Sequence, residues 1–173
     1  MKIERVVVGA LEENCYILKK DGNALVIDPG AEIDKINEAI GTSRVVGVLV
    51  THHHFDHVGA LPNYSKDIIY DFYNLEEKEH NIENFKFKVI YTRGHSSDSI
   101  SYYFEDEKAL FSGDFIFYES IGRWDMPSGD FDKMLGSIEK IKKYPSDIKI
   151  YPGHGDDTTL KHEIENNFYF KEN

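Results

Sequence analysis

A ten-residue segment, residues 51–60, concentrates four histidines and one aspartate in the sequence THHHFDHVGA. It follows the apolar run VVGVLV, which is typical of a strand buried on both faces, and ligand sites in α/β proteins lie at the carboxyl ends of such strands. On extended backbone His52 and His54 point to the same side, while Asp56 and His57 follow where a helix can begin. Imidazoles beside a carboxylate suit Zn²⁺ and similar metals, so the segment predicts a metal site.

Three further residues stand in a similar setting, each after a strand-like run and beside a glycine. They are His95 in YTRGHSSDS, Asp114 in ALFSGDFIF and His154 in IYPGHGDD. Glycine permits tight turns and a close approach of the backbone to a site. Each residue alone is weak evidence, but beside the histidine cluster they become candidates to complete the coordination of the metal.

The remaining histidines and the single cysteine are expected to have structural roles. His53 should point away from its neighbours, because successive side chains on extended backbone alternate. His80 and His162 lie in charged stretches and should be solvated. Cys15 lies in an apolar strand, where it is expected to be a small buried side chain rather than a nucleophile.

The elements that must position these residues follow from the hydrophobic pattern. Residues 31–41 and 130–144 have apolar side chains at helical spacing, with Gly41 as a C-cap and Asp130 as an N-cap. Two further helices are expected at 57–67 and 158–170, and a charged loop at 74–85. Strands are expected at 3–9, within 14–30 (two), and at 45–50, 68–73, 86–94, 100–107, 108–117 and 147–155. Two groups of strands, each with helices, indicate one α/β domain that spans residues 1–173.

The composition bounds the partners of the protein. The 173 residues carry 31 acidic and 20 basic side chains, a formal net charge of −11. Such a field repels polyanions, so no nucleic acid is expected as partner. No run approaches the roughly 18 apolar residues of a membrane span, and no secretory signal is evident. The expected picture is a cytoplasmic protein, monomer or homodimer, that takes a small-molecule substrate and binds no membrane.

Four motifs in this order, THHHFDH, GHSSDS, SGD and PGHG, resemble those of the metallo-β-lactamase superfamily. ENCYIL, ALVIDPGAE, VLVTHHHFDHVGAL and IGRWDMPSGD are similar to sequences of its small, glyoxalase II-like (hydroxyacylglutathione hydrolase-like) bacterial hydrolases. The resemblance runs from about Glu13 to His154. It implies an αββα sandwich, in which two mixed sheets pack face to face with helices outside.

The resemblance also implies ligands and a cofactor of two divalent metal ions. It assigns His52, His54 and His95 to one ion, Asp56, His57 and His154 to the other, and Asp114 as the bridge. Asp28, in VIDPG, matches an aspartate that supports the site from behind, and its alternative is a turn residue before Pro29. The superfamily's di-iron oxygen reductases have glutamate where this chain has His54, so the resemblance favours Zn²⁺, while Fe and Mn also suit nitrogen and oxygen ligands.

The activity implied is hydrolysis of a small ester or thioester, such as S-lactoylglutathione, by attack of a metal-bound hydroxide on a carbonyl carbon. Asp56 would orient the hydroxide. Full-length glyoxalase II has a C-terminal helical domain with glutathione-binding residues that find no counterpart here, so the sequence leaves open whether glutathione is part of the substrate. Two alternatives remain: a mononuclear iron persulfide dioxygenase, and a module in which metals only stabilise the fold.

Three residues after Asp114 are candidates for the substrate pocket. Arg123 can bind a substrate carboxylate, or it can form an internal ion pair with Asp125 or Asp130. Trp124 and Tyr118 are candidates to wall the pocket, with packing elsewhere as their alternative.

Overall fold

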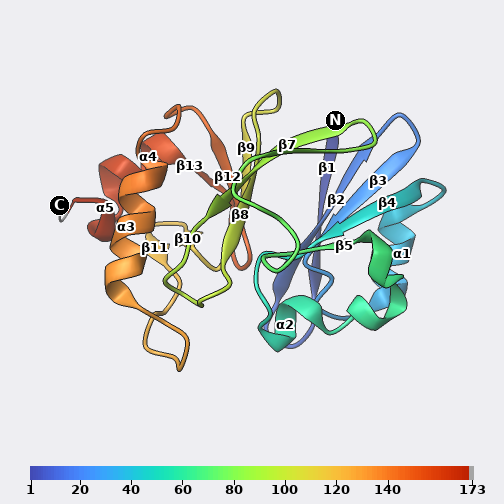
Figure 1. Ribbon diagram of the computed structural model, residues 1–173, viewed down its shortest axis with the longest axis horizontal. Coiled ribbons are helices and arrows are strands. Elements are labelled where there is room, and N and C mark those ends of the chain that lie inside the picture. The colour runs from blue at the N-terminus through green and yellow to red at the C-terminus, as the bar shows by residue number, and fades with distance from the viewer. Residues whose placement is uncertain (172–173) are drawn as a thin grey trace.

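Two β-sheets pack face to face in the computed structural model, which describes residues 1–171 (Figure 1). The first sheet has the strand order β1-β2-β3-β4-β5; β1, β2 and β3 are antiparallel, and β3, β4 and β5 are parallel. Its strands are β1 (Lys2–Val8), β2 (Glu13–Lys20), β3 (Asn23–Ile27), β4 (Arg44–Leu49) and β5 (Ile69–Tyr70).

The second sheet has the order β13-β12-β9-β8-β7-β6, with only β12 and β9 parallel. Its strands are β6 (Glu79–Ile82), β7 (Phe85–Tyr91), β8 (Ile100–Phe104), β9 (Ala109–Gly113), β12 (Lys149–Pro152) and β13 (Thr158–Thr159). A small hairpin joins β10 (Ile116–Phe117) and β11 (Ser120–Ile121). The helices are α1 (Ile33–Ile40), α2 (Phe55–Val58), α3 (Phe131–Ile141), α4 (Leu160–Asn166) and α5 (Phe168–Lys171).

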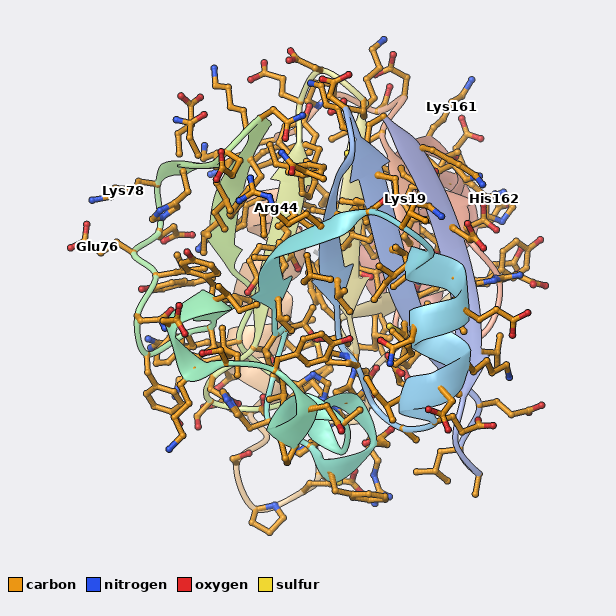
Figure 2. All side chains as sticks on the ribbon, turned by 90° about the vertical axis from the view of Figure 1, so that its right-hand side faces the viewer. Lys19, Arg44, Glu76, Lys78, Lys161 and His162 are labelled. Carbon is orange, nitrogen blue, oxygen red and sulfur yellow. The ribbon has the colours of Figure 1, made fainter. Side chains whose placement is uncertain are left out.

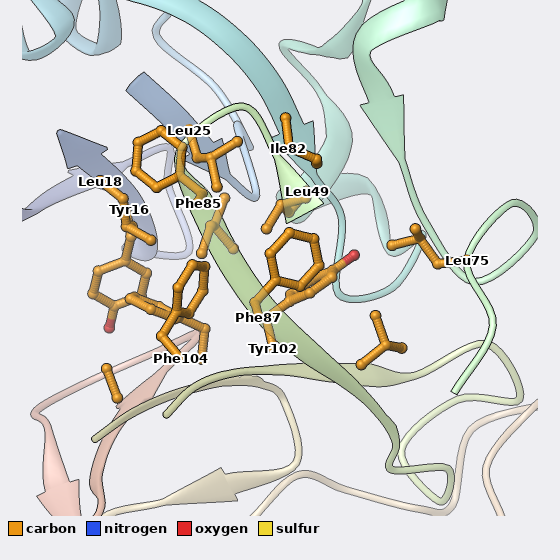
Figure 3. Close-up of a cluster of buried hydrophobic side chains, with 14 of the residues drawn as sticks. Tyr16, Leu18, Leu25, Leu49, Leu75, Ile82, Phe85, Phe87, Tyr102 and Phe104 are labelled. Atoms are coloured by element: carbon orange, nitrogen blue, oxygen red, sulfur yellow. The ribbon is translucent and has the colours of Figure 1, made fainter. Parts of the chain in front are cut away.

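Three hydrophobic layers hold the sandwich together. Between the sheets, Leu18 and Leu49 from the first sheet belong to one buried cluster with Phe87 and Tyr102 from the second (Figure 3). A second cluster packs α3 to α5 against the outer face of the second sheet. The third packs α1 onto the first sheet, where Figure 2 shows the helix lying over β1 and β2. The predicted αββα sandwich of two mixed sheets is confirmed.

Both predicted helix caps are present. Helix α1 ends at Ile40 and is followed by its C-cap Gly41, whose φ of 62° favours glycine. In α3 the Asp130 side chain accepts a hydrogen bond from the backbone N–H of Lys133 at 3.0 Å. A first-turn donor that would otherwise lack a partner is satisfied in this way.

Other local predictions were wrong. The expected helix at 57–67 is α2, which begins at Phe55, followed by two 3₁₀ turns at Leu61–Asn63 and Lys66–Ile68. The charged segment at 74–85 contains β6, an edge strand whose polar side chains face water while its backbone pairs with β7. The terminal helix is broken at Asn167, whose backbone is extended and whose buried side chain donates to the Ser120 carbonyl and to Glu163. Within residues 1–171 no helix has the length and apolar character needed to cross a membrane.

Candidate metal centre

The seven predicted ligands come together at one edge of the sandwich, at the ends of four strands. The loop after β4 and helix α2 supply four of them, and the ends of β7, β9 and β12 in the second sheet supply the others. In Figure 1 α2 and the loop before α3 lie at this same lower edge. The ligands are His52, His54, Asp56 and His57 from the first sheet, and His95, Asp114 and His154 from the second.

The first trio of histidines faces a common point. The Nδ1 atom of His54 lies 2.9 Å from the Nε2 atom of His95. The ring of His52 lies 4.6 Å from that of His54 and 4.9 Å from that of His95, between centroids. One nitrogen of each ring lies within 4.8 Å of the other two, a spacing that one ion can span.

The second trio forms around Asp56, whose Oδ2 atom lies 3.1 Å from His154 Nε2 and 3.6 Å from His57 Nε2. Asp114 lies between the two trios. Its Oδ1 atom is 3.3 Å from His57 Nε2, and its Oδ2 atom is 3.5 Å from His95 Nε2 and 3.6 Å from His154 Nε2. Asp114 therefore has one carboxylate within reach of both positions, which is the place of a bridging ligand.

Four of the histidine rings are oriented by a hydrogen bond at the ring nitrogen that faces away from the centre. Protein oxygens lie next to the Nδ1 atoms of four rings: Thr51 Oγ1 at 3.1 Å from His52, Asp28 Oδ2 at 3.0 Å from His57, the Arg123 carbonyl at 2.7 Å from His95, and the Leu11 carbonyl at 3.0 Å from His154. Because Thr51 already donates to Asp28, its hydroxyl accepts from His52. These contacts place the hydrogen on Nδ1 and turn the Nε2 lone pair toward the centre.

Three buried donor atoms test whether the site fits a metal. Among residues 1–171, His52 Nε2, His57 Nε2 and Asp114 Oδ1 are buried without a hydrogen-bond partner. Buried polar atoms are costly when unpaired, and all three point into the same centre. Burial lowers the pKa of His57, but the carboxylates of Asp114 and Asp28 beside its ring outweigh it and raise the pKa well above its usual range. The surroundings therefore favour positive charge, and the donor set fits divalent ions.

Asp28 takes the supporting position that the sequence comparison implied. Its φ of 50° is a left-handed backbone conformation that aspartate tolerates better than most residues. Its Oδ1 atom accepts from the Thr51 N–H at 2.7 Å, and its Oδ2 atom accepts from the Thr51 hydroxyl at 2.6 Å as well as contacting His57.

His53 faces away from the centre, as expected, and binds Asp98. Its Nδ1 atom lies 2.6 Å and its backbone nitrogen 3.2 Å from Asp98 Oδ2. Burial alone would raise the pKa of Asp98, but hydrogen bonds from His53 and Ser96 hold it below its usual range. This ionised carboxylate links the loop after β4 to the loop after β7.

Of the two predicted roles of Arg123, the structure shows the internal ion pair. Its guanidinium forms two bonds with Asp125, 2.8 Å from Nε to Oδ1 and 3.1 Å from Nη2 to Oδ2, so the expected internal ion pair is present. Its backbone carbonyl holds His95. Trp124 packs on Phe131 at 4.6 Å, outside the cleft described below. Tyr118 likewise lies outside the cleft and stacks on the ring of His162, which also contacts Glu119.

Several functional residues escaped the sequence reasoning. Thr51 directly precedes the first candidate ligand, and its hydroxyl at that position could have been predicted to support the site. Glu13 is fully buried with neither carboxylate oxygen hydrogen-bonded, 3.7 Å from His57 Nδ1, and burial raises its pKa to about 10. Nothing in ENCYIL distinguishes this glutamate from a solvated one. The sequence could not single out the carbonyls of Leu11 and Arg123, because every residue has a backbone carbonyl. Cys15 is fully buried, as expected.

A cleft of about 950 Å³ opens over the ligands. Its floor includes His54, Asp56, His95, Asp114 and His154, and its walls come from the β1–β2 turn, α2, the β10–β11 hairpin and the loop before α3. A substrate in this cleft lies directly against the metal-binding side chains.

Known proteins are similar to this chain in sequence and in fold. A probable metallo-hydrolase of Bacillus subtilis, YqgX, is 32% identical, with 96% of each chain covered. The hydroxyacylglutathione hydrolase GloC of Haemophilus influenzae is 29% identical over 96% of this chain and 97% of its own. Among solved structures, the B3 metallo-beta-lactamase BLEG-1 superposes with a TM-score of 0.92 at 29% identity, covering 98% of this chain and 100% of that one.

Two further structures bear on the metal and the fold. TTHA1623, solved in a di-iron-bound form, has a TM-score of 0.87 at 28% identity and covers 96% of this chain and 99% of that one. ETHE1 from Myxococcus xanthus has a TM-score of 0.88 over 97% of this chain and 84% of its own, and its 23% identity shows the fold alone.

The sequence also matches a protein family, and this match agrees with the geometry of the candidate metal centre. Residues 8–85 and 68–154 match the metallo-beta-lactamase superfamily, and these ranges include all seven ligand positions. Proteins of this fold bind divalent metal ions, and the donor atoms converge here as such binding requires. With motif order, αββα layers and the converging donor atoms all in agreement, this chain belongs to the metallo-beta-lactamase superfamily.

Proposed function

We propose that the protein is a dinuclear metal-dependent hydrolase of a small ester or thioester, with a glyoxalase II-like reaction. The observation that carries this proposal is the convergence of seven donor side chains, five of them at the floor of the cleft, with three buried donor atoms that have no hydrogen-bond partner in the described chain. Zn²⁺ is the proposed metal, and Fe or Mn suit the same nitrogen and oxygen donors. Two ions bound there would make water nucleophilic at neutral pH and stabilise negative charge on a carbonyl oxygen.

The side chains of the centre divide the remaining tasks. The four backing hydrogen bonds keep the rings oriented, so little reorganisation accompanies the reaction. Asp56 is half-buried at the cleft floor, where its carboxylate accepts a hydrogen bond from the attacking water and orients it. Asp114 holds the two halves of the site together. The ester or thioester carbonyl enters from the cleft side, the open side of the centre.

The hydrolase reading is supported by relatives named probable metallo-hydrolase and hydroxyacylglutathione hydrolase. The alternative, a mononuclear iron persulfide dioxygenase, uses fewer of these residues. The second trio of Asp56, His57 and His154 is as fully assembled as the first, so the chain offers donor atoms for two ions rather than one. This observation favours the hydrolase.

The test pairs metal analysis with a substrate panel. We expect close to two transition-metal ions per chain in the purified protein. With thioesters, lactones, phosphodiesters, a β-lactam and glutathione persulfide as substrates, hydrolysis of thioesters should be fastest, should stop on chelation and should return with Zn²⁺ or Mn²⁺. Asp114→Ala should lower kcat/KM at least about 100-fold, whereas His162→Ala, a histidine outside the centre, serves as the matched control.

Three outcomes would contradict the proposal. Chelator-insensitive hydrolysis would exclude the metal mechanism. One iron per chain with oxygen consumption on persulfide would establish the dioxygenase. Metal binding with no turnover of any substrate would leave a purely structural role for the ions.

A further inference from the structure

We propose that the substrate of this site is an ester or thioester with a bulky apolar group and without the paired carboxylates of glutathione. The inference rests on the proposed hydrolase function and specifies its substrate class.

The cleft walls are built from apolar side chains on every side of the metal-binding floor. The set consists of Leu11, Phe55, Phe117, Ile121, Met126 and Pro127. They come from the β1–β2 turn, α2, the β10–β11 hairpin and the loop before α3, so they surround the floor rather than forming one patch. A substrate that reaches the floor therefore has apolar atoms against its flanks.

Two of these side chains are left unusually exposed. Phe55 is 76% exposed and Leu11 is 53% exposed, whereas the core residues of both sheets are almost fully buried. Exposed apolar area next to a cavity is a mark of ligand sites, because covering it with an apolar group is favourable. Phe55 lies between the ligands His54 and Asp56, so a group that covers its ring lies next to the reacting carbonyl.

The same walls offer little to bind anionic groups. Among the residues that line the cleft in the described part of the chain, Arg123 is the only lysine or arginine, and its guanidinium already forms two bonds with Asp125. The other polar wall residues are Ser120 and Ser128, which carry no charge. Glutathione brings two carboxylates, and the walls provide no pair of free cations for them.

The experiment compares four thioesters that differ in two features only. Acetyl and hexanoyl groups are each attached to N-acetylcysteamine, which is uncharged, and to glutathione. A buried methylene is worth up to about four-fold, so four methylenes that realise half of this free energy give about 16-fold. We expect kcat/KM for hexanoyl to exceed that for acetyl at least about 15-fold, and neutral thioesters to react no more slowly than glutathione thioesters with the same acyl group.

Variants locate the effect in the cleft. Phe55→Ala and Leu11→Ala should each lower the hexanoyl-to-acetyl ratio at least about five-fold. Phe168→Ala removes another exposed phenylalanine outside the cleft and should keep the ratio. Binding is measured separately by calorimetry with two thioethers that cannot be hydrolysed, S-hexyl-N-acetylcysteamine and S-hexylglutathione. The neutral compound should bind at least as tightly, and Phe55→Ala should weaken it about ten-fold.

The outcomes separate the two proposals. If none of the four thioesters is hydrolysed, the proposed function fails. If they are hydrolysed but glutathione thioesters react ten-fold faster, or chain length has no effect, the function stands and the apolar substrate class is overturned. An unchanged hexanoyl-to-acetyl ratio in the double variant Phe55→Ala, Leu11→Ala would also overturn the apolar substrate class.

Discussion

Single hydrogen bonds behind the ligands decide how well the centre is formed. Asp28 is the most connected of these supports, since its two oxygens receive the Thr51 N–H, the Thr51 hydroxyl and the His57 ring. Each of these partners donates a hydrogen, so the site requires an acceptor at both oxygens. A carboxylate meets this requirement and a carboxamide does not.

Asp28→Asn should therefore weaken metal binding while leaving the fold intact. The new NH₂ group must face a donor, either Thr51 or His57, and the orientation of the His57 ring is lost. Loss of such a support costs about 10- to 100-fold in metal affinity. Competition with a chromophoric chelator measures the change. Asp106→Asn removes the same charge from the turn before β9, at the opposite end of that strand from Asp114, and should bind metal like the wild type. Equal affinity of the two variants would show that Asp28 is only a turn residue.

A second residue-scale support is the contact of Asp98 with His53. Asp98 is buried and ionised, and it accepts from the ring and backbone of His53 and from the Ser96 hydroxyl at 2.7 Å. Hydrogen bonds to a charged, buried acceptor contribute more than neutral ones.

Asp98→Ala should lower the free energy of unfolding by about 1–3 kcal/mol, because it leaves the His53 and Ser96 donors without their partner. Urea unfolding of the metal-free protein measures this loss of unfolding free energy separately from any change in metal binding. Ser97→Ala, at the exposed neighbouring position, should change the free energy of unfolding by less than about 0.5 kcal/mol. A loss of similar size in both variants would assign the effect to the loop rather than to the Asp98 contact.

At the scale of elements, glycines let strand ends approach the ligands. At Gly153, directly after β12, an added Cβ would lie 2.3 Å from Asp114 Oδ1 and 2.7 Å from His57 Cε1. The backbone of this loop thus fills the space immediately behind two ligands. Gly136, in α3, has nothing within 4 Å of an added Cβ and has no such role.

These two glycines should respond to alanine in opposite ways. Gly153→Ala should reduce metal content well below that of the wild type, because Asp114 or His57 must move. Gly136→Ala should bind metal normally and gain about 0.5–1 kcal/mol of stability, since alanine loses less entropy than glycine in a helix. Metal analysis and thermal unfolding of both variants check this. Normal metal content in Gly153→Ala would mean that the loop can relax away from the ligands.

The elements also show what sequence could and could not predict. The first four ligands lie in one motif, and the other three follow strand ends beside glycines, so residue types and order were enough to select them. Helix α3 could be predicted because the spacing of its apolar side chains and the N-cap Asp130 both indicate the same helix. Strand β6 could not be predicted in this way. As an edge strand it buries few side chains, and its pairing with β7 depends on tertiary contacts that its charged sequence does not reveal. The Leu11 and Arg123 carbonyls depend on loop geometry alone.

At the scale of the whole molecule, the candidate metal centre joins the two sheets. Four ligands follow strand β4 of the first sheet and three follow strands of the second, and Asp114 contacts both trios. Without a cation, two carboxylates and the unpaired nitrogens face one another across the junction. Bound ions thus replace an unfavourable junction by ligand bonds that span the sandwich.

Metal removal should consequently lower the stability of the whole fold and not only abolish activity. A ligand at about 100 times its Kd stabilises the native state by about 2.7 kcal/mol, and in a chain of this size that corresponds to a Tm shift of about 5–10 °C. Thermal unfolding with and without a chelator measures the shift, and added Zn²⁺ or Mn²⁺ should restore it in proportion to metal content. His154→Ala, which removes a ligand of the second sheet, should reduce the shift, whereas His162→Ala should keep it. Complete loss of metal without a change in Tm would contradict this expectation, because an ion that binds the folded chain and not the unfolded chain must raise Tm.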